Sequence, residues 1–225
     1  MRLIYRVEIK NNYIVKGLQY EGVRKIKLID DFVLPLNIDV EELFVVDLTR
    51  SVFSLPPNYA ALENLASKTL LPITFGGGIS TLEQALLAFK LGASRVYLNS
   101  AIHNNSSLIA NITNIVGKQA VVAGCEYRVE GGQRNCYIES GREPIQQTVN
   151  FRADNLVEMG AGEILLSNID SDGMLTGFDV DVLSDTSLDV PITLASGGNN
   201  LLKESYSAIK GCEAVSFSKS LLSIL

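Results

Sequence analysis

The chain has 225 residues, with 19 Lys and Arg against 25 Asp and Glu and a formal net charge of −6. This length fits one domain with a large core, and 47% hydrophobic with 20% charged residues is a globular balance. The acidic charge and the lack of a basic tract argue against nucleic acid as the main partner. No apolar run reaches about 18 residues, so we expect no membrane span.

Three cysteines, Cys125, Cys136 and Cys212, are odd in number and widely spaced. Their pattern predicts neither a disulfide framework nor a zinc site. The first residues are too charged for a signal peptide, so we expect a cytoplasmic protein. His103 is the only histidine, which excludes a His-based metal cluster. We expect no metal and no cofactor, and acid–base chemistry falls to carboxylates.

Eight short apolar runs rich in β-branched residues indicate strands. In chain order they span residues 3–8, 43–48, 72–75, 94–98, 119–125, 163–167, 191–195 and 213–217. Apolar residues at helical spacing predict helices between them. These cover residues 57–66, 81–91, 104–115, 147–159 and 200–209.

Three stretches depart from this regular alternation. Pro35 interrupts the segment after the first strand, so a helix there is expected to be weak. Residues 127–140 alternate around Gly131-Gly132, which predicts a hairpin inserted after the fifth strand. Few residues follow the eighth strand, so we expect a short helical turn from Ser218 and a shortened C-terminal end.

The same signals occur twice in the same order. Glu8 is followed by Asp47 and then by the glycines at 76–78, and Glu126 is followed by residues 167–173 and then by Gly197-Gly198. A repeat on this scale predicts two related half-barrels, roughly 1–116 and 117–225, within one domain. Four strand–helix units in each half give a two-fold pseudo-symmetric (β/α)8 TIM barrel, with its site at the ends of the strands.

Six stretches in barrel order carry a family resemblance. They are Ile14-Val15-Lys16-Gly17, Phe75-Gly-Gly-Gly-Ile79, Leu98-Asn99-Ser100-Ala101, Gly160-Ala-Gly-Glu-Ile-Leu-Leu166, Ile169-Asp-Ser-Asp-Gly173 and Ala195-Ser-Gly-Gly198. Over nearly its whole length the sequence resembles the cyclase subunit of imidazole glycerol phosphate synthase in histidine biosynthesis. It is more distantly similar to the related ribonucleotide isomerase of that pathway.

The resemblance implies a lyase-type cyclase that receives ammonia from a glutaminase partner at the N-terminal face of the barrel. The family closes an imidazole ring on a bisphosphate sugar-nucleotide and uses two aspartates as acid and base. Glu8 and Glu126 stand at those positions, so both carboxyl groups are kept and each side chain is one methylene longer. We expect them to face each other across the C-terminal mouth of the barrel.

The resemblance also implies two related phosphate pockets, in which glycine lets backbone N–H groups reach the phosphate oxygens. The substrate-binding positions are Lys16, Gly76, Gly77, Gly78, Asn99, Ser100, Asp172, Ser196, Gly197, Gly198, Ser218 and Lys219. The family places the first of these, Lys16, on a mobile loop that reaches toward the substrate.

At the bottom of the barrel the family guards the ammonia entrance with a ring of charges. The matching positions here are Arg2, Glu42, Arg95 and Glu163. Strand parity puts Arg6 on the same face as Glu8, where the family has small side chains, and Tyr97 lies at a similar position on the fourth strand. We expect Arg6 to pair with Glu8 or Glu126, so that ammonia-dependent turnover is weak or absent.

Two alternatives remain open from the sequence. One is a divergent paralogue that amidates an activated sugar in surface-polysaccharide biosynthesis. The other is a non-catalytic barrel that binds a glutaminase-like partner. The Asp-to-Glu changes and the filled lumen favour these alternatives, whereas the paired carboxylates and the two glycine turns favour the cyclase.

Overall fold

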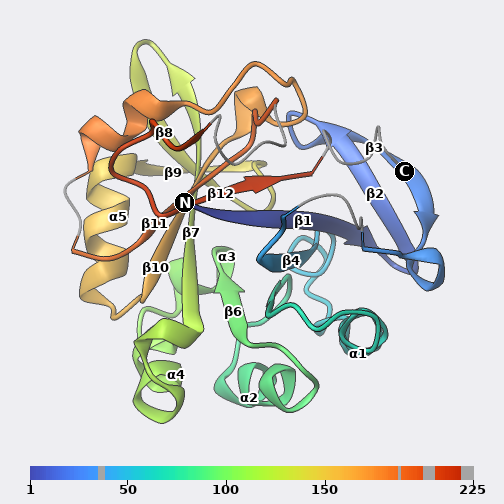
Figure 1. The fold of residues 1–225 in the computed structure, drawn as a ribbon. Helices are drawn as coiled ribbons and strands as arrows, with labels where there is room; N and C mark the ends of the chain where they lie inside the picture. The colour runs from blue at the N-terminus through green and yellow to red at the C-terminus, as the bar shows by residue number, and fades with distance from the viewer. Residues whose placement is uncertain (35–38, 187–188, 200–205, 219–225) are drawn as a thin grey trace.

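The computed structural model describes residues 1–34, 39–186, 189–199 and 206–218. Eight parallel strands form a closed barrel, because the last strand pairs with the first (Figure 1). Around the barrel they are β1 (Arg2–Lys10), β4 (Glu42–Asp47), β5 (Ile73–Gly76), β6 (Arg95–Leu98), β7 (Val121–Glu130), β10 (Glu163–Asn168), β11 (Ile192–Ala195) and β12 (Ala214–Phe217). The predicted (β/α)8 barrel is confirmed.

Helices cover the outside of the barrel (Figure 1). They are α1 (Tyr59–Ala66), α2 (Leu82–Lys90), α3 (Ser100–Asn104), α4 (Leu108–Val116) and α5 (Val149–Glu158), with the short 3-10 helices η1 (Ile29–Asp31), η2 (Lys118–Ala120), η3 (Ile169–Ser171) and η4 (Val180–Asp185). Thr81 begins α2 with a capping box to Gln84, which fixes where that helix starts. Among the described helices, none is long and apolar enough to cross a membrane.

The predicted helices are mostly confirmed. The helix expected at 104–115 corresponds to α4, which begins at Leu108. The separate short helix α3 ends at Asn104, just before it. Residues 200–205 of the expected helix 200–209 lie outside the described residues, as does the turn expected after Ser218.

Two strands of the barrel continue into antiparallel hairpins. β1 pairs with β2 (Tyr13–Leu18) and β2 with β3 (Glu21–Leu28), while β7 pairs with β8 (Gln133–Ile138) and β8 with β9 (Glu143–Thr148). The hairpin expected at 127–140 is confirmed, but β9 was not predicted. Where a weak first helix was expected, the described residues contain only η1, and the preceding strands β2 and β3 were not predicted. β3 is mostly exposed, so its polar residues give no apolar alternation to detect.

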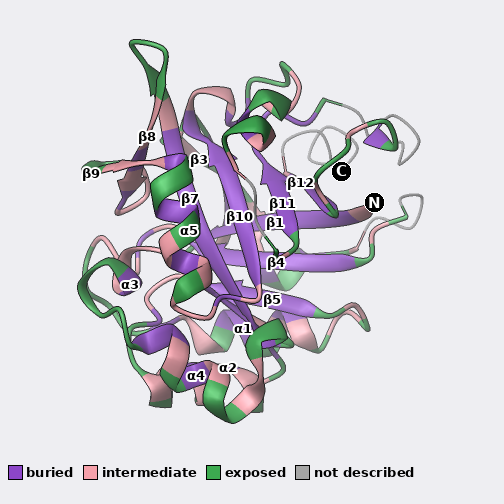
Figure 2. Ribbon diagram, turned by 90° about the vertical axis from the view of Figure 1, so that its left-hand side faces the viewer, coloured by how far each residue is buried: buried purple, intermediate pink, exposed green. Residues whose placement is uncertain are grey.

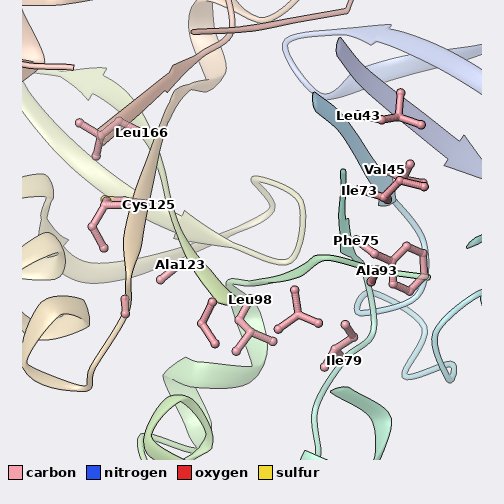
Figure 3. Packing of buried hydrophobic residues seen from close by; sticks show 14 of the residues in the cluster. Leu43, Val45, Ile73, Phe75, Ile79, Ala93, Leu98, Ala123, Cys125 and Leu166 are labelled. Atoms are coloured by element: carbon pink, nitrogen blue, oxygen red, sulfur yellow. The ribbon is translucent and has the colours of Figure 1, made fainter. Parts of the chain in front are cut away.

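Side chains alternate along the strands between two clusters. Outward-facing residues such as Phe75, Leu98 and Cys125 belong to the large cluster between barrel and helices (Figure 3). Inward-facing residues form a second cluster in the lumen: Ile4, Phe44, Val46, Tyr97, Val122, Leu165, Ala195 and Ala214. The barrel strands are buried along most of their length, whereas the tip of the β7–β8 hairpin is exposed (Figure 2).

Candidate functional site

Four charged residues at the beginnings of the strands close the N-terminal end of the barrel. Arg2 Nε lies 3.1 Å from Glu42, and its Nη2 lies 2.6 Å from Glu163. Arg95 also pairs with both Glu42 and Glu163. The sequence analysis predicts these four residues at this end of the barrel. They form a charge ring in which arginine and glutamate alternate and each arginine contacts both glutamates.

Two threonines support the charge ring in the same way in each half of the barrel. Thr74 Oγ1 donates to Glu42 at 2.5 Å, and Thr193 Oγ1 donates to Glu163. Burial alone would raise the pKa of Glu163, but Arg95 and Arg2 outweigh it and hold that pKa below its ordinary value. Glu163 therefore stays ionised at neutral pH.

At the opposite end of the barrel, Glu8 lies within a buried group of charges. Lys16 Nζ donates to the two Glu8 oxygens at 2.8 and 3.0 Å and to the two Asp172 oxygens at 2.9 and 3.0 Å. Arg6 Nε lies 3.2 Å from Glu8 Oε1. All four side chains are more than nine-tenths buried. Two basic and two acidic side chains thus balance each other in formal charge within this buried group.

Lys16 belongs to strand β2, whereas the family resemblance places it on a mobile loop. β2 pairs with β1, with Val15 opposite Glu8, and Lys16 is the next residue along β2. The backbone N–H of Gln19 donates to the Asp172 carbonyl at 2.9 Å. These contacts fasten the hairpin to the segment after β10.

Glu126 occupies a different environment from Glu8. Tyr97 Oη donates to its Oε1 at 3.1 Å, and its Oε2 has no hydrogen-bond partner within the described part of the chain. Burial raises the pKa of Glu126 to about 7, even though Arg6 and the hydrogen bond from Tyr97 act to lower it. At neutral pH this side chain can therefore both give and accept a proton.

Tyr97 fits in the lumen because two strand positions beside it are glycine. A Cβ on Gly76 would lie 2.7 Å from Tyr97 Cδ1, and one on Gly124 would lie 2.2 Å from Tyr97 Oη. The ring meets Phe44 edge-on, with 5.0 Å between the centroids. Tyr97 thus spans the lumen from β6 toward β5 and β7, as expected.

Arg6 fills another part of the lumen. Besides its contact with Glu8, its guanidinium carbon lies 5.6 Å from the centroid of Tyr20 and 5.7 Å from that of Phe44. The expected burial and pairing of Arg6 are confirmed, with Glu8 as the partner. The lumen therefore contains a cation near two aromatic rings, where the family resemblance implies small side chains.

The first glycine turn lies in a pocket of about 430 Å³ at the C-terminal mouth. The expected residues Gly77, Gly78, Asn99 and Ser100 line this pocket together with Glu126. Gly77 and Gly78 have φ of +101° and +80°, and a Cβ on either would overlap neighbouring atoms. Only glycine fits there, which keeps the backbone open to a ligand.

A family model described as histidine biosynthesis protein matches residues 7–223. The chain belongs to this family. It is 32% identical over 203 residues to the imidazole glycerol phosphate synthase subunit HisF of Chlorobaculum parvum, covering 89% of this chain and 81% of that protein. It is 33% identical over 207 residues to the subunit HisF of Legionella pneumophila, covering 91% and 98%.

In this histidine biosynthesis barrel, the pocket at the second glycine turn is much smaller than the pocket at the first. Ser196, Gly197, Gly198 and Ser218 line a pocket of only about 10 Å³, barely the room that one water needs. A Cβ on Gly197 would lie 2.1 Å from the Gly177 carbonyl oxygen, so the segment between η3 and η4 approaches this turn closely. Lys219 lies outside the described residues.

Several pocket residues of this family member were not assigned to the site from the sequence. Asp47 accepts hydrogen bonds from the backbone N–H of Thr49 at 2.9 Å and from Arg50 Nε at 3.1 Å. Arg50 lines the pocket at the first glycine turn and brings a positive charge to it. The strand-end position of Asp47 was the available signal. Glu139 and Ser140 also line the pocket, but they come from the unpredicted β8–β9 turn.

Proposed function

We propose that this chain is the cyclase subunit of an imidazole glycerol phosphate synthase, working with a glutaminase that docks on the N-terminal face of the barrel. The observation that carries the proposal is the charge ring of Arg2, Glu42, Arg95 and Glu163 at one end, opposite a pocket with an unpaired carboxylate at the other. The synthase name of both relatives supports the same assignment.

The proposed chemistry gives the two carboxylates, Glu8 and Glu126, different roles. Adding ammonia to a carbonyl carbon requires a proton for the oxygen and removal of one from the nitrogen, and Glu126 can exchange protons at neutral pH. Glu8, paired with Lys16 and Arg6, would act electrostatically and stabilise positive charge that develops on nitrogen. Glu126 is therefore the acid–base residue, and Glu8 is an electrostatic one.

The substrate would lie with one phosphate at the first glycine turn and its reacting carbon near Glu126. Gly77, Gly78, Asn99 and Ser100 would bind the phosphate, with Arg50 supplying positive charge. The second phosphate would belong at Ser196, Gly197 and Gly198, a turn that must open to admit it because its pocket is so small. Arg6 and Tyr97 narrow the path of ammonia, so turnover is expected to be slow.

We place this reaction in the cytoplasm, in keeping with the three free cysteines of the chain. Sugar amidation and a non-catalytic role are less favoured, since both relatives described above bear the synthase name.

The test is conversion of the family's sugar-nucleotide substrate to the aminoimidazole carboxamide nucleotide, with added ammonia and, separately, with glutamine and a family glutaminase. Measurable turnover that Glu126→Gln abolishes supports the proposal. No turnover with either nitrogen source by the folded protein would overturn it. Turnover that survives in Glu126→Gln would overturn the assigned role of Glu126.

A further inference from the structure

The turn between β8 and β9 covers one side of the pocket at the first glycine turn. Glu139 and Ser140 line this pocket, and neither position belongs to the glycine turns. The backbone N–H of Glu139 donates to Ser100 Oγ at 2.9 Å, and Ser140 Oγ donates to the Leu48 carbonyl at 3.2 Å. The turn is thus fastened to the ends of β6 and β4, on both sides of the glycine turn that ends β5.

The conformation of this turn fixes the position of Glu139. Glu139, Ser140 and Gly141 have successive φ values of +51°, +55° and +75°. Residues other than glycine adopt this conformation only where their surroundings impose it. The two hydrogen bonds to Ser100 and Leu48 supply that constraint.

Two carboxylate oxygens in this pocket lack a donor. Glu126 Oε2 and Glu139 Oε2 are both shielded from solvent, and neither has a hydrogen-bond partner among the residues that the structure describes. Arg50, which lines the same pocket, is paired with Asp47. Buried carboxylate oxygens need donors, and a ligand that brings hydroxyl groups to these two atoms would supply them.

We propose that Glu139 is a specificity-determining residue that accepts hydrogen bonds from the vicinal hydroxyl groups of the sugar whose phosphate lies at the first glycine turn. A carboxylate is an acceptor with two oxygens, which suits a pair of adjacent hydroxyls. Its link to Ser100 places it beside the phosphate position. The inference rests on the proposed function, because it assumes a phosphorylated sugar in this pocket.

The test compares ribose 5-phosphate, 2-deoxyribose 5-phosphate and inorganic phosphate by titration calorimetry with the intact protein. The unmodified chain should prefer ribose 5-phosphate over its deoxy analogue by roughly ten- to one-hundred-fold, the range for a hydrogen bond to a charged group. In Glu139→Ala this preference should fall toward unity. Inorganic phosphate has no sugar hydroxyls, so a change in its affinity in Glu139→Ala measures only the like-charge repulsion that the substitution removes.

Glu143→Gln is the matched control, because Glu143 is an exposed carboxylate on the same hairpin and does not line the pocket. It should keep the preference of the unmodified chain, and Glu139→Gln should be intermediate. Thermal unfolding of each variant verifies that it is folded.

A preference unchanged in Glu139→Ala would overturn the inference, as would equal weakening of both sugars or no binding of either sugar phosphate. Tighter binding of phosphoethanolamine than of ribose 5-phosphate would also overturn it, because the carboxylate would then select an amine. These readouts are binding constants, so a chain without cyclase turnover can still satisfy them, and the two proposals fail separately.

Discussion

Tyr97 Oη donates to Glu126 Oε1 at 3.1 Å, while Glu126 Oε2 is left without a partner among the described residues. One oxygen of the carboxyl group is thus held by a side chain in the lumen, and the other is buried without a hydrogen bond. Because β6 and β7 are neighbours in the barrel, the contact joins adjacent strands at the level of the site. Tyr97 therefore acts as a positioning residue for Glu126, in addition to filling the lumen.

The raised pKa of Glu126 predicts a specific pH dependence of stability. Its pKa is about 7 in the folded protein against an ordinary 4.5, so the folded state binds the proton more tightly. The free energy of unfolding should therefore fall as pH rises from about 4.5 through 7, by up to roughly 3 kcal/mol from this group. Denaturant unfolding of Glu126→Gln across this range should lack that slope. Equal slopes in both proteins would contradict the assignment, and Glu143→Gln should behave like the unmodified chain.

The glycine beside Tyr97 predicts a compensating pair of substitutions. Gly124→Ala places a Cβ 2.2 Å from Tyr97 Oη and 2.7 Å from its Cζ, so it should destabilise the fold by roughly 1–3 kcal/mol. In a Tyr97→Leu background the same change should cost at least about 1 kcal/mol less, because the overlapping atoms are gone. Chemical denaturation of the four proteins of this cycle measures the coupling. Strictly additive costs would show that the ring does not occupy this space.

Removal of Arg6 should destabilise the protein and alter the site. Arg6→Ala leaves Glu8 with Lys16 alone and should lower the free energy of unfolding by roughly 3–5 kcal/mol, the range for breaking a buried pair. Arg24→Ala, which removes an exposed arginine on β3, should cost far less. Ammonia-dependent turnover of the unmodified chain should be weak. Fast glutamine-driven turnover would instead indicate an open path past Arg6.

The charge ring predicts a stability loss that depends on pH. Arg95→Met leaves two buried carboxylates, Glu42 and Glu163, to share Arg2, and should cost about 3 kcal/mol at pH 7. The lowered pKa of Glu163 contributes stability above its ordinary pKa of 4.5 and loses it as pH falls. The gap between the variant and the unmodified chain should therefore narrow in acid. Lys90→Met, at an exposed helix end, is the control, and a gap that is constant with pH would contradict the prediction.

Much of the barrel and its charges could be predicted because strand parity is a local property. The inward face of β1 carries Arg2, Ile4, Arg6 and Glu8 in strict alternation, which identifies both the ring residue and the lumen cation before any partner is known. Parity also separates Glu126, which faces inward, from the adjacent Cys125, which packs outward against α5 and its neighbours.

Contacts between distant segments could not be predicted in the same way. Lys16 reaches Asp172, 156 positions away, only because β2 folds back on β1, and β2 and β3 lack the apolar pattern of a barrel strand. Glu139 was missed because its position depends on a turn between two hairpin strands. Gly124 did carry a usable signal, since glycine within a strand often marks the close approach of another group.

The charge ring also distinguishes the two halves of the chain from each other. Its members Arg2, Glu42 and Arg95 precede α4, and Glu163 follows it, so a cut between α4 and β7 would divide the ring into parts of net charge +1 and −1. Two copies of the first part would meet with a surplus of positive charge, and two copies of the second with only carboxylates. Co-expressed fragments would therefore favour the mixed assembly over either self-assembly.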